Sequence, residues 1–197
     1  MSVYSAKISV DDGIMLDLPD STGRDHFEAT FLGQSMQPHW KGLTLYPNID
    51  PGKPENDFMM CLSSAAYVLS SQAANIMSRI RNKGFELLEV TVHGRTKPYY
   101  ILNVDTVADC LDKQRSKMLY ASDDPQKLLL VERLHFVPTR IPDVATFKVP
   151  EVRNRFFVTK PFVDVVLETK LTGIYFEDPV KEEFGLKQPL WGTPFLM

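Results

Sequence analysis

A repeat at an offset of 89 residues is the feature that most constrains what this chain can fold into. Val68-Leu69-Ser70 aligns with Phe157-Val158-Thr159, and the alignment runs without a gap to Gly84 in the first copy and Gly173 in the second. Each copy has the pattern of an apolar strand, a hydroxyl that can cap a helix, a helix of about 12 residues, a glycine stop and a further strand. Two independent occurrences of this common pattern would align in the same way. We favour two structurally related halves that share one core.

The first copy gives the more detailed expectation. Ser70 or Ser71 suits the N-cap of a helix over residues 72–83, because Ala73, Ile76, Met77 and Ile80 share one face of it. Gly84 suits the position after the helix, where a positive φ is common. The two strand–helix–strand units are expected at about residues 66–92 and 155–178.

Other strands are predicted from alternating or continuous apolar runs at residues 3–9, 26–32, 99–104, 127–136 and 144–149. Residues 33–57 are expected to be irregular, because four prolines restrict regular structure there. The predicted fold class is α+β, with mixed, largely antiparallel sheets and a few helices. Residues 1–56 would hold N-terminal strands and the irregular segment, and residues 57–197 the main α+β part, within one compact domain.

Composition excludes several classes of function. The 197 residues are 44% hydrophobic and 24% charged with a net charge of −3, which is ordinary for a globular protein and lacks the basic footprint of nucleic-acid binding. No apolar run approaches the ~20 residues that span a bilayer, and residues 1–13 lack the features of a secretory signal. Two cysteines are too few for a disulfide framework. These observations predict a cytoplasmic protein with no membrane contact.

Charge is unevenly distributed along the chain. Residues 1–60 carry nine acidic and four basic side chains, whereas the rest of the chain is slightly basic. Acidic side chains in loops can simply be solvated, but complementary potentials also accelerate encounter with a basic partner. The N-terminal third is therefore one candidate surface for a protein partner.

Motifs for catalysis, cofactors or metals are missing. The four histidines are dispersed, with no HxxxH, HxH or CxxC spacing, and no phosphate-binding glycine loop occurs. Cys110 lies between Asp109 and Asp112, whose charges disfavour a thiolate. We predict no catalytic, cofactor-binding or metal site.

Two stretches resemble a known family. Residues 99–116, YYILNVDTVADCLDKQRS, and residues 156–179, FFVTKPFVDVVLETKLTGIYFEDP, are similar to immunity protein family 11, found in bacterial polymorphic toxin loci. The resemblance covers residues 57–178 well and the first 56 poorly. It implies an α+β protein without known catalysis that neutralises a toxin encoded by a neighbouring gene. It provides no functional residues, because the recurrent positions suit a structural role; these are Tyr99, Asn103, Asp109, Cys110 and Asp112.

The predicted function is therefore toxin neutralisation by protein–protein contact, over a typical interface of roughly 1,200–2,000 Å². One alternative is a small hydrolase with a site assembled from His39, His93 or Cys110. Another is a self-associating structural or regulatory module that forms a homodimer through a sheet edge. The candidate contact residues are acidic or aromatic; they are Asp11, Asp12, Asp17, Asp20, Trp40, Tyr46, Phe58 and Trp191, with Phe195 as a further anchor.

Overall fold

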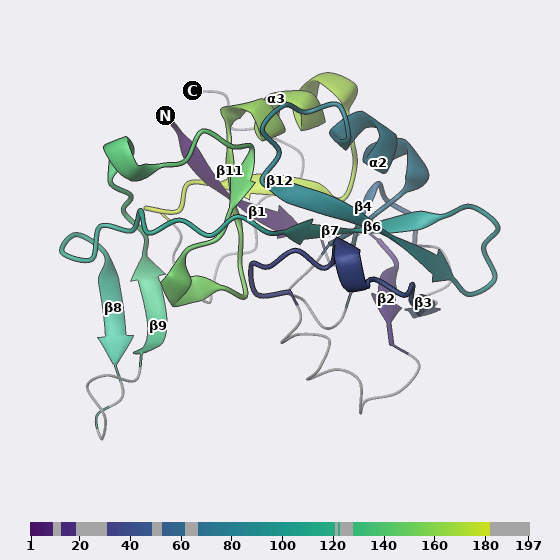
Figure 1. Cartoon of the computed structure of the whole chain (residues 1–197), viewed down its shortest axis with the longest axis horizontal. Helices are drawn as coiled ribbons and strands as arrows, with labels where there is room; N and C mark the ends of the chain where they lie inside the picture. Colours follow the sequence, from purple (N-terminus) through teal and green to yellow (C-terminus); the bar gives the residue numbers. More distant parts are fainter. Residues whose placement is uncertain are drawn as a thin grey trace.

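The structure is a computed structural model, and it describes residues 1–9, 13–18, 31–48, 53–61, 67–120, 122 and 128–181. Short strands dominate it, with two α-helices and three 3-10 turns among these residues (Figure 1). In chain order the elements are β1 (Val3–Ile8), β2 (Met15–Asp17), η2 (Gln37–His39), β3 (Thr44–Asn48), β4 (Phe58–Met60), β5 (Tyr67–Leu69), α2 (Ser71–Met77), β6 (Phe85–Val92), β7 (Tyr99–Val104), β8 (Lys117–Tyr120), β9 (Leu128–Arg133), η3 (Pro138–Arg140), β10 (Thr146–Phe147), η4 (Pro150–Val152), β11 (Phe157–Thr159), α3 (Lys160–Thr169) and β12 (Ile174–Glu177).

The strands form three sheets. A six-stranded sheet has the order β2-β3-β6-β7-β5-β4, a four-stranded sheet has the order β10-β11-β1-β12, and β8 pairs with β9. Every strand pair is antiparallel except β3 with β6. The α+β class with largely antiparallel sheets is therefore confirmed. Because β1 lies between β11 and β12, N-terminal residues complete the sheet of the C-terminal half.

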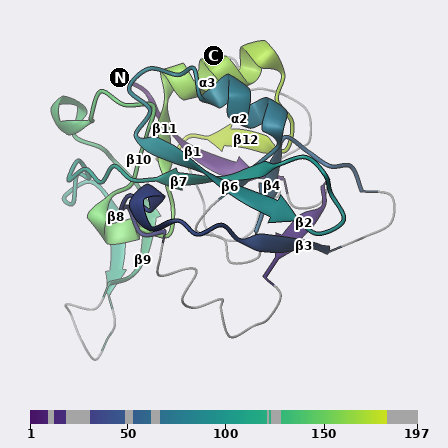
Figure 2. The same cartoon turned by 45° about the vertical axis from the view of Figure 1, so that its right-hand side comes forward.

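The two strand–helix–strand segments have the same surroundings. In the first, β5 and β6 flank β7; in the second, β11 and β12 flank β1. A short strand pairs with the outer side of each segment's first strand: β4 is antiparallel to β5, and β10 is antiparallel to β11. Both helices cover one side of the sheets (Figures 1 and 2). That the two segments are structurally related repeats stays a prediction.

Each segment places its glycine against the other segment's short strand. Gly84 has φ +68°, and a Cβ there would lie 2.0 Å from the carbonyl oxygen of Thr146 in β10. Gly173 has φ +85°, and a Cβ there would lie 2.1 Å from the carbonyl oxygen of Phe58 in β4. The Thr146 N–H donates to the Lys83 carbonyl at 3.0 Å, next to the first glycine. Both positions therefore require glycine for a backbone conformation and for a close approach.

Helix α2 begins as predicted but ends early. The Ser70 hydroxyl accepts from the Ala73 N–H at 3.1 Å and so caps the helix. The expected extension to residue 83 is wrong, since the helix ends at Met77 and the chain turns through Asn82, which has φ +48°. The carbonyl of Asn82 instead accepts from the Ala145 N–H at 2.7 Å. Pairing with the segment before β10 thus replaces the last turns of the helix.

The predicted irregular stretch 33–57 contains a strand, so that prediction is wrong in part. Strand β3 holds Pro47 opposite Leu16 of β2, while only Thr44 and Leu45 pair with β6. Proline is tolerated because the parallel ladder ends before it. Of the strand predicted over residues 26–32, residues 26–30 lie outside the described part, and Phe31 and Leu32 lie in a turn and bend.

Buried side chains form three clusters. The largest lies between the helices and the sheets, where Met77 of α2 and Phe162 of α3 are fully buried. The second lies inside the curved six-stranded sheet, whose ends approach each other through a bridge between Leu16 and Cys61. The third contains Cys110 and packs on the other face of the four-stranded sheet. Together these clusters fix the loops that carry the exposed features below.

Candidate partner-binding surfaces

Two of the residues expected to contact a partner lie towards one end of the six-stranded sheet. Asp17 of β2 is directly opposite Tyr46 of β3. The Tyr46 side chain is 39% exposed and stacks on His93, with ring centroids 5.0 Å apart and an interplanar angle of 19°. We call Asp17, Tyr46 and His93 the β2–β3 edge. His93 was not expected to contribute, because only its position after a strand was visible in the sequence.

Trp40 lies near this edge in a mainly structural role. Its indole N–H donates to the Glu89 carbonyl of β6 at 2.7 Å. Its ring contacts Phe31 edge-on, with centroids 6.3 Å apart. The side chain is half-buried. Trp40 therefore anchors the segment before β3 to the sheet.

Phe58 does not belong to an exposed surface, which corrects its place among the candidates. Its side chain is 0% exposed and packs against Phe162 within the largest cluster. A partner cannot reach it without opening the core. The remaining expected residues, Asp11, Asp12, Asp20, Trp191 and Phe195, lie outside the described residues.

A partly buried polar network holds the loop that leads from Phe31 to β3. The Glu86 carboxylate accepts from the Met36 N–H at 2.5 Å, the Ser35 hydroxyl at 2.8 Å and the Asn103 amide at 2.7 Å. Asn103 is directly opposite Glu86 in the β6–β7 ladder and also donates to the Gln34 carbonyl at 2.8 Å. Burial and the nearby Glu86 charge raise the pKa of Asp105. The network fixes the loop with charge-assisted hydrogen bonds.

Lys148 secures the same loop from the other side. Its side chain is fully buried, and its ammonium group donates to the carbonyls of Phe31 at 2.5 Å and Arg153 at 2.8 Å. Burial lowers the pKa of this lysine to about 8. Its two carbonyl partners assign it a structural role, joining the start of the loop to the turn at η4.

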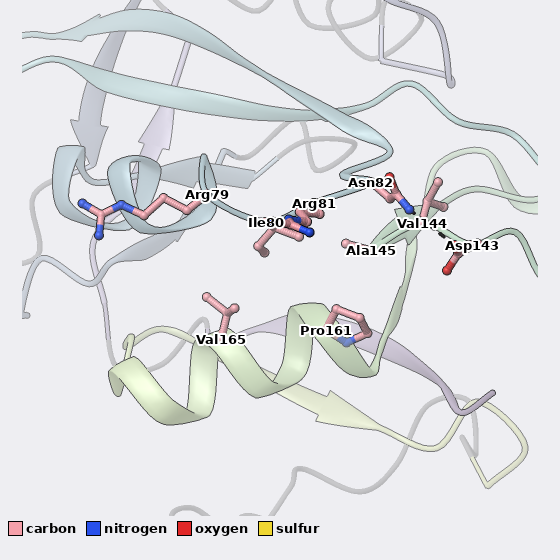
Figure 3. A pocket seen from close by; sticks show the side chains of 9 residues that line it. All are labelled: Arg79, Ile80, Arg81, Asn82, Asp143, Val144, Ala145, Pro161 and Val165. Carbon is pink, nitrogen blue, oxygen red and sulfur yellow. Dashed lines mark hydrogen bonds between the residues drawn. The ribbon is translucent and has the colours of Figure 1, made fainter.

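A hollow of about 360 Å³ lies between the end of α2, the start of α3 and the segment before β10 (Figure 3). Its apolar wall includes Ile80, Val144 and Val165, while Arg79 points away from the other lining side chains. None of the buried polar atoms that lack a partner in the described part of the chain belongs to this lining. Its polar lining includes Asn82 and Asp143, and the Asn82 amide donates to the Asp143 carboxylate at 3.3 Å.

A projecting pair of strands is the exposed feature that the sequence did not reveal. Strand β8 carries Leu119 and Tyr120, which are 41% and 46% exposed. Both figures show β8 and β9 extending away from the larger sheets (Figures 1 and 2). We call this pair the β8–β9 hairpin. Only an apolar run at residues 127–136 had indicated it, without a partner strand.

The groups considered for catalysis lie on separate elements, with His39 in η2 and His93 just after β6. Cys110 is 0% exposed, and burial raises the pKa of its thiol to about 11, which keeps it in the weakly nucleophilic thiol form. His93 stacks on Tyr46 at the surface, while Cys110 lies in the third core cluster. Among the described residues, no three His, Cys, Asp or Glu side chains are placed to hold a metal ion.

The described residues define a class by their fold: an α+β protein with an exposed sheet edge and a projecting hairpin. In the part of the chain that the structure describes, no helix is long and apolar enough to cross a membrane. The model of the immunity protein family (Imm11) matches residues 28–181, and the chain belongs to this family. A comparison with curated proteins finds none that matches the sequence.

Proposed function

We propose that this protein protects its cell by binding a toxin encoded by a neighbouring gene and neutralising it through direct contact. Membership of an immunity family over residues 28–181 is the observation that carries this proposal. The matched residues include the exposed Tyr46 and Leu119, while Asp17 of the β2–β3 edge lies before them. Binding would take place in the cytoplasm, where the two buried thiols stay reduced.

The β2–β3 edge is proposed as one contact with the toxin. Tyr46 offers an amphipathic ring that His93 already holds in place, so little side-chain entropy is lost on binding. Asp17 adds a carboxylate beside it, although one of its oxygens already accepts from the Leu18 N–H at 2.8 Å. A contact of this kind fits a basic, partly apolar patch on the toxin.

Co-expression with the product of the neighbouring gene tests the proposal. That product alone should stop growth, and this protein should restore growth and co-purify with it at a fixed stoichiometry. Substitution Tyr46→Ser should weaken binding, whereas Gln72→Ala, an exposed change on α2, should not. If the neighbouring product is harmless, or if protection occurs without any complex, the proposed function is wrong.

A further inference from the structure

The turn between β6 and β7 is an exposed, projecting stretch beside the β2–β3 edge. Every residue from His93 to Pro98 is exposed, and we call these residues the β6–β7 turn. A Cβ added at Gly94 would meet no atom within 4 Å, so the space around the turn is open. In Figure 1 the turn projects from the ends of the two strands that it joins. It is therefore a convex feature of the surface.

Both ends of the β6–β7 turn are attached to other elements. At its start, the His93 N–H donates to the Leu45 carbonyl of β3 at 2.8 Å. At its end, the Pro98 carbonyl accepts from the hydroxyl of Ser71, the first residue of α2. The turn is thus held between a strand and a helix that come from different parts of the chain.

Glu55 holds the middle of the turn. Its carboxylate accepts from the Arg95 guanidinium at 2.9 Å and from the Tyr99 hydroxyl. Burial and the bond to Glu55 raise the pKa of Tyr99 to about 12, so its hydroxyl keeps the proton that it donates. The Arg95 N–H also donates to the Val92 carbonyl at 2.9 Å, which closes the turn. A projection attached at three points loses little conformational entropy when it meets a partner.

The side chains on this projection are of the types that anchor protein interfaces. Tyr46 stacks on His93 at the base of the turn, with ring centroids 5.0 Å apart, and Arg95 lies two residues further along. Tyrosine and arginine are enriched among the residues that contribute most to binding. The stacked pair and the turn together form one continuous, ordered contact surface.

Shape, and not charge, indicates what this surface contacts. Arg95 is paired with Glu55, and Asp17 and Lys53 have partners of their own. Lys97 has no partner among the described residues, but a single cation does not define the charge of a binding surface. A rigid convex turn buries its sides as well as its tip only when the opposing surface is concave.

We propose that the β6–β7 turn, with the Tyr46–His93 stack at its base, inserts into a cleft of the toxin. This inference rests on the proposed function and specifies how the toxin is recognised. Clefts are where proteins usually bind their small-molecule ligands and substrates. Insertion of the turn would therefore block a toxin that acts as an enzyme.

Photo-crosslinking tests the insertion directly. The photoreactive residue p-benzoylphenylalanine, placed at the exposed Thr96, should crosslink to the purified neighbouring gene product on irradiation. Mass spectrometry should locate the adduct on residues that line one cleft of the toxin. The same photoreactive residue at Gln114, which is exposed in the turn before β8, is the matched control and should form no adduct.

Binding constants of variants test the fit of the turn. Thr96→Trp enlarges the tip and should raise the dissociation constant roughly tenfold or more, because a fitted cleft has no room for the indole. The matched control Gln114→Trp should change it by less than about threefold. Glu55→Gln should raise it about threefold to tenfold, since the free turn loses one attachment that must be restored on binding. Circular dichroism and thermal unfolding of each variant establish that it folds.

Several outcomes would overturn the inference while leaving immunity intact. These are a lack of adducts at position 96 together with normal binding by Thr96→Trp, or adducts that fall on a flat or convex face of the toxin. Adducts between two copies of this protein would also overturn it, because the occupant would then be a second copy. Absence of any complex with the wild type would refute the proposed function itself.

Discussion

The glycine contacts between the two strand–helix–strand segments lead to a quantitative prediction. Substitution Gly84→Ala adds a methyl group 2.0 Å from the Thr146 carbonyl oxygen, where the backbone must move because both partners are main chain. Gly94 provides a matched control: its φ is +76°, close to the +68° of Gly84, but an added Cβ meets no atom within 4 Å. The two substitutions therefore share the conformational cost and differ in the contact.

The expected magnitudes follow from these two contributions. Placing alanine in the left-handed region costs about 1–2 kcal/mol at either site. At Gly84, β10 must also withdraw, which disrupts the bonds from Ala145 N–H to the Asn82 carbonyl (2.7 Å) and from Thr146 N–H to the Lys83 carbonyl (3.0 Å). Each of these hydrogen bonds contributes about 1 kcal/mol net, and some packing is lost as well. Together with the conformational cost, Gly84→Ala should lower the free energy of unfolding by ~3–5 kcal/mol.

Equilibrium urea unfolding, followed by circular dichroism, measures the difference in the free energy of unfolding between the Gly84→Ala and Gly94→Ala variants. We expect Gly94→Ala to lower the free energy of unfolding by about 1–2 kcal/mol and Gly84→Ala by at least twice as much. Gly173→Ala should match Gly84→Ala, because its Cβ would lie 2.1 Å from the Phe58 carbonyl oxygen. If Gly84→Ala and Gly94→Ala differ by less than 1 kcal/mol, the close approach of the two segments is not what requires glycine.

Three further predictions concern buried polar groups and thiols. Burial lowers the pKa of Lys148 from 10.5 to about 8, so between these pH values the unfolded chain holds a proton that the folded chain lacks. Relative to Lys148→Met, the free energy of unfolding of the wild type should rise by roughly 3 kcal/mol from pH 8 to 10.5, and this gain should be lost as pH falls. A difference in urea unfolding that does not depend on pH would contradict this prediction. Substitution Glu86→Gln should weaken the attachment of the loop before β3 to the sheet by about 1–3 kcal/mol, which would appear as faster hydrogen exchange at the Met36 amide. Unchanged exchange at this amide would argue against the hydrogen-bond network around Glu86. Cys61 and Cys110, both 0% exposed, should react with a thiol reagent only after unfolding, so rapid labelling of the native protein would show that the clusters open.

Local patterns in the sequence predicted much of the fold. The strand over residues 99–104 was found with its exact bounds, because a nearly continuous apolar run marks it. The cap at Ser70 was also found, since it depends on neighbouring residues only. The end of α2 was missed because the Asn82 carbonyl pairs with the segment before β10, some sixty residues along the chain. Contacts of that range leave no local pattern.

The candidate surface was less predictable than the fold. Asp17 and Tyr46 were expected separately, but their position opposite each other depends on a strand pair that was not predicted. Phe58 was expected to be exposed because aromatic residues are common anchors in interfaces, yet its neighbours in the largest cluster bury it completely. The short strand β8 gave no signal, since its exposure of Leu119 and Tyr120 breaks the usual alternation.

The position of β1 has a consequence for how the protein forms. Residues 3–8 pair with residues 157–159 on one side and 174–177 on the other, so the four-stranded sheet joins segments more than 150 residues apart. During synthesis, its N-terminal strand must wait until almost the whole described chain has left the ribosome. Folding of this sheet is therefore expected to be slow, as in other proteins rich in distant contacts. The four-stranded sheet, and the part of the core that packs on it, can therefore be complete only after residue 177 has been translated.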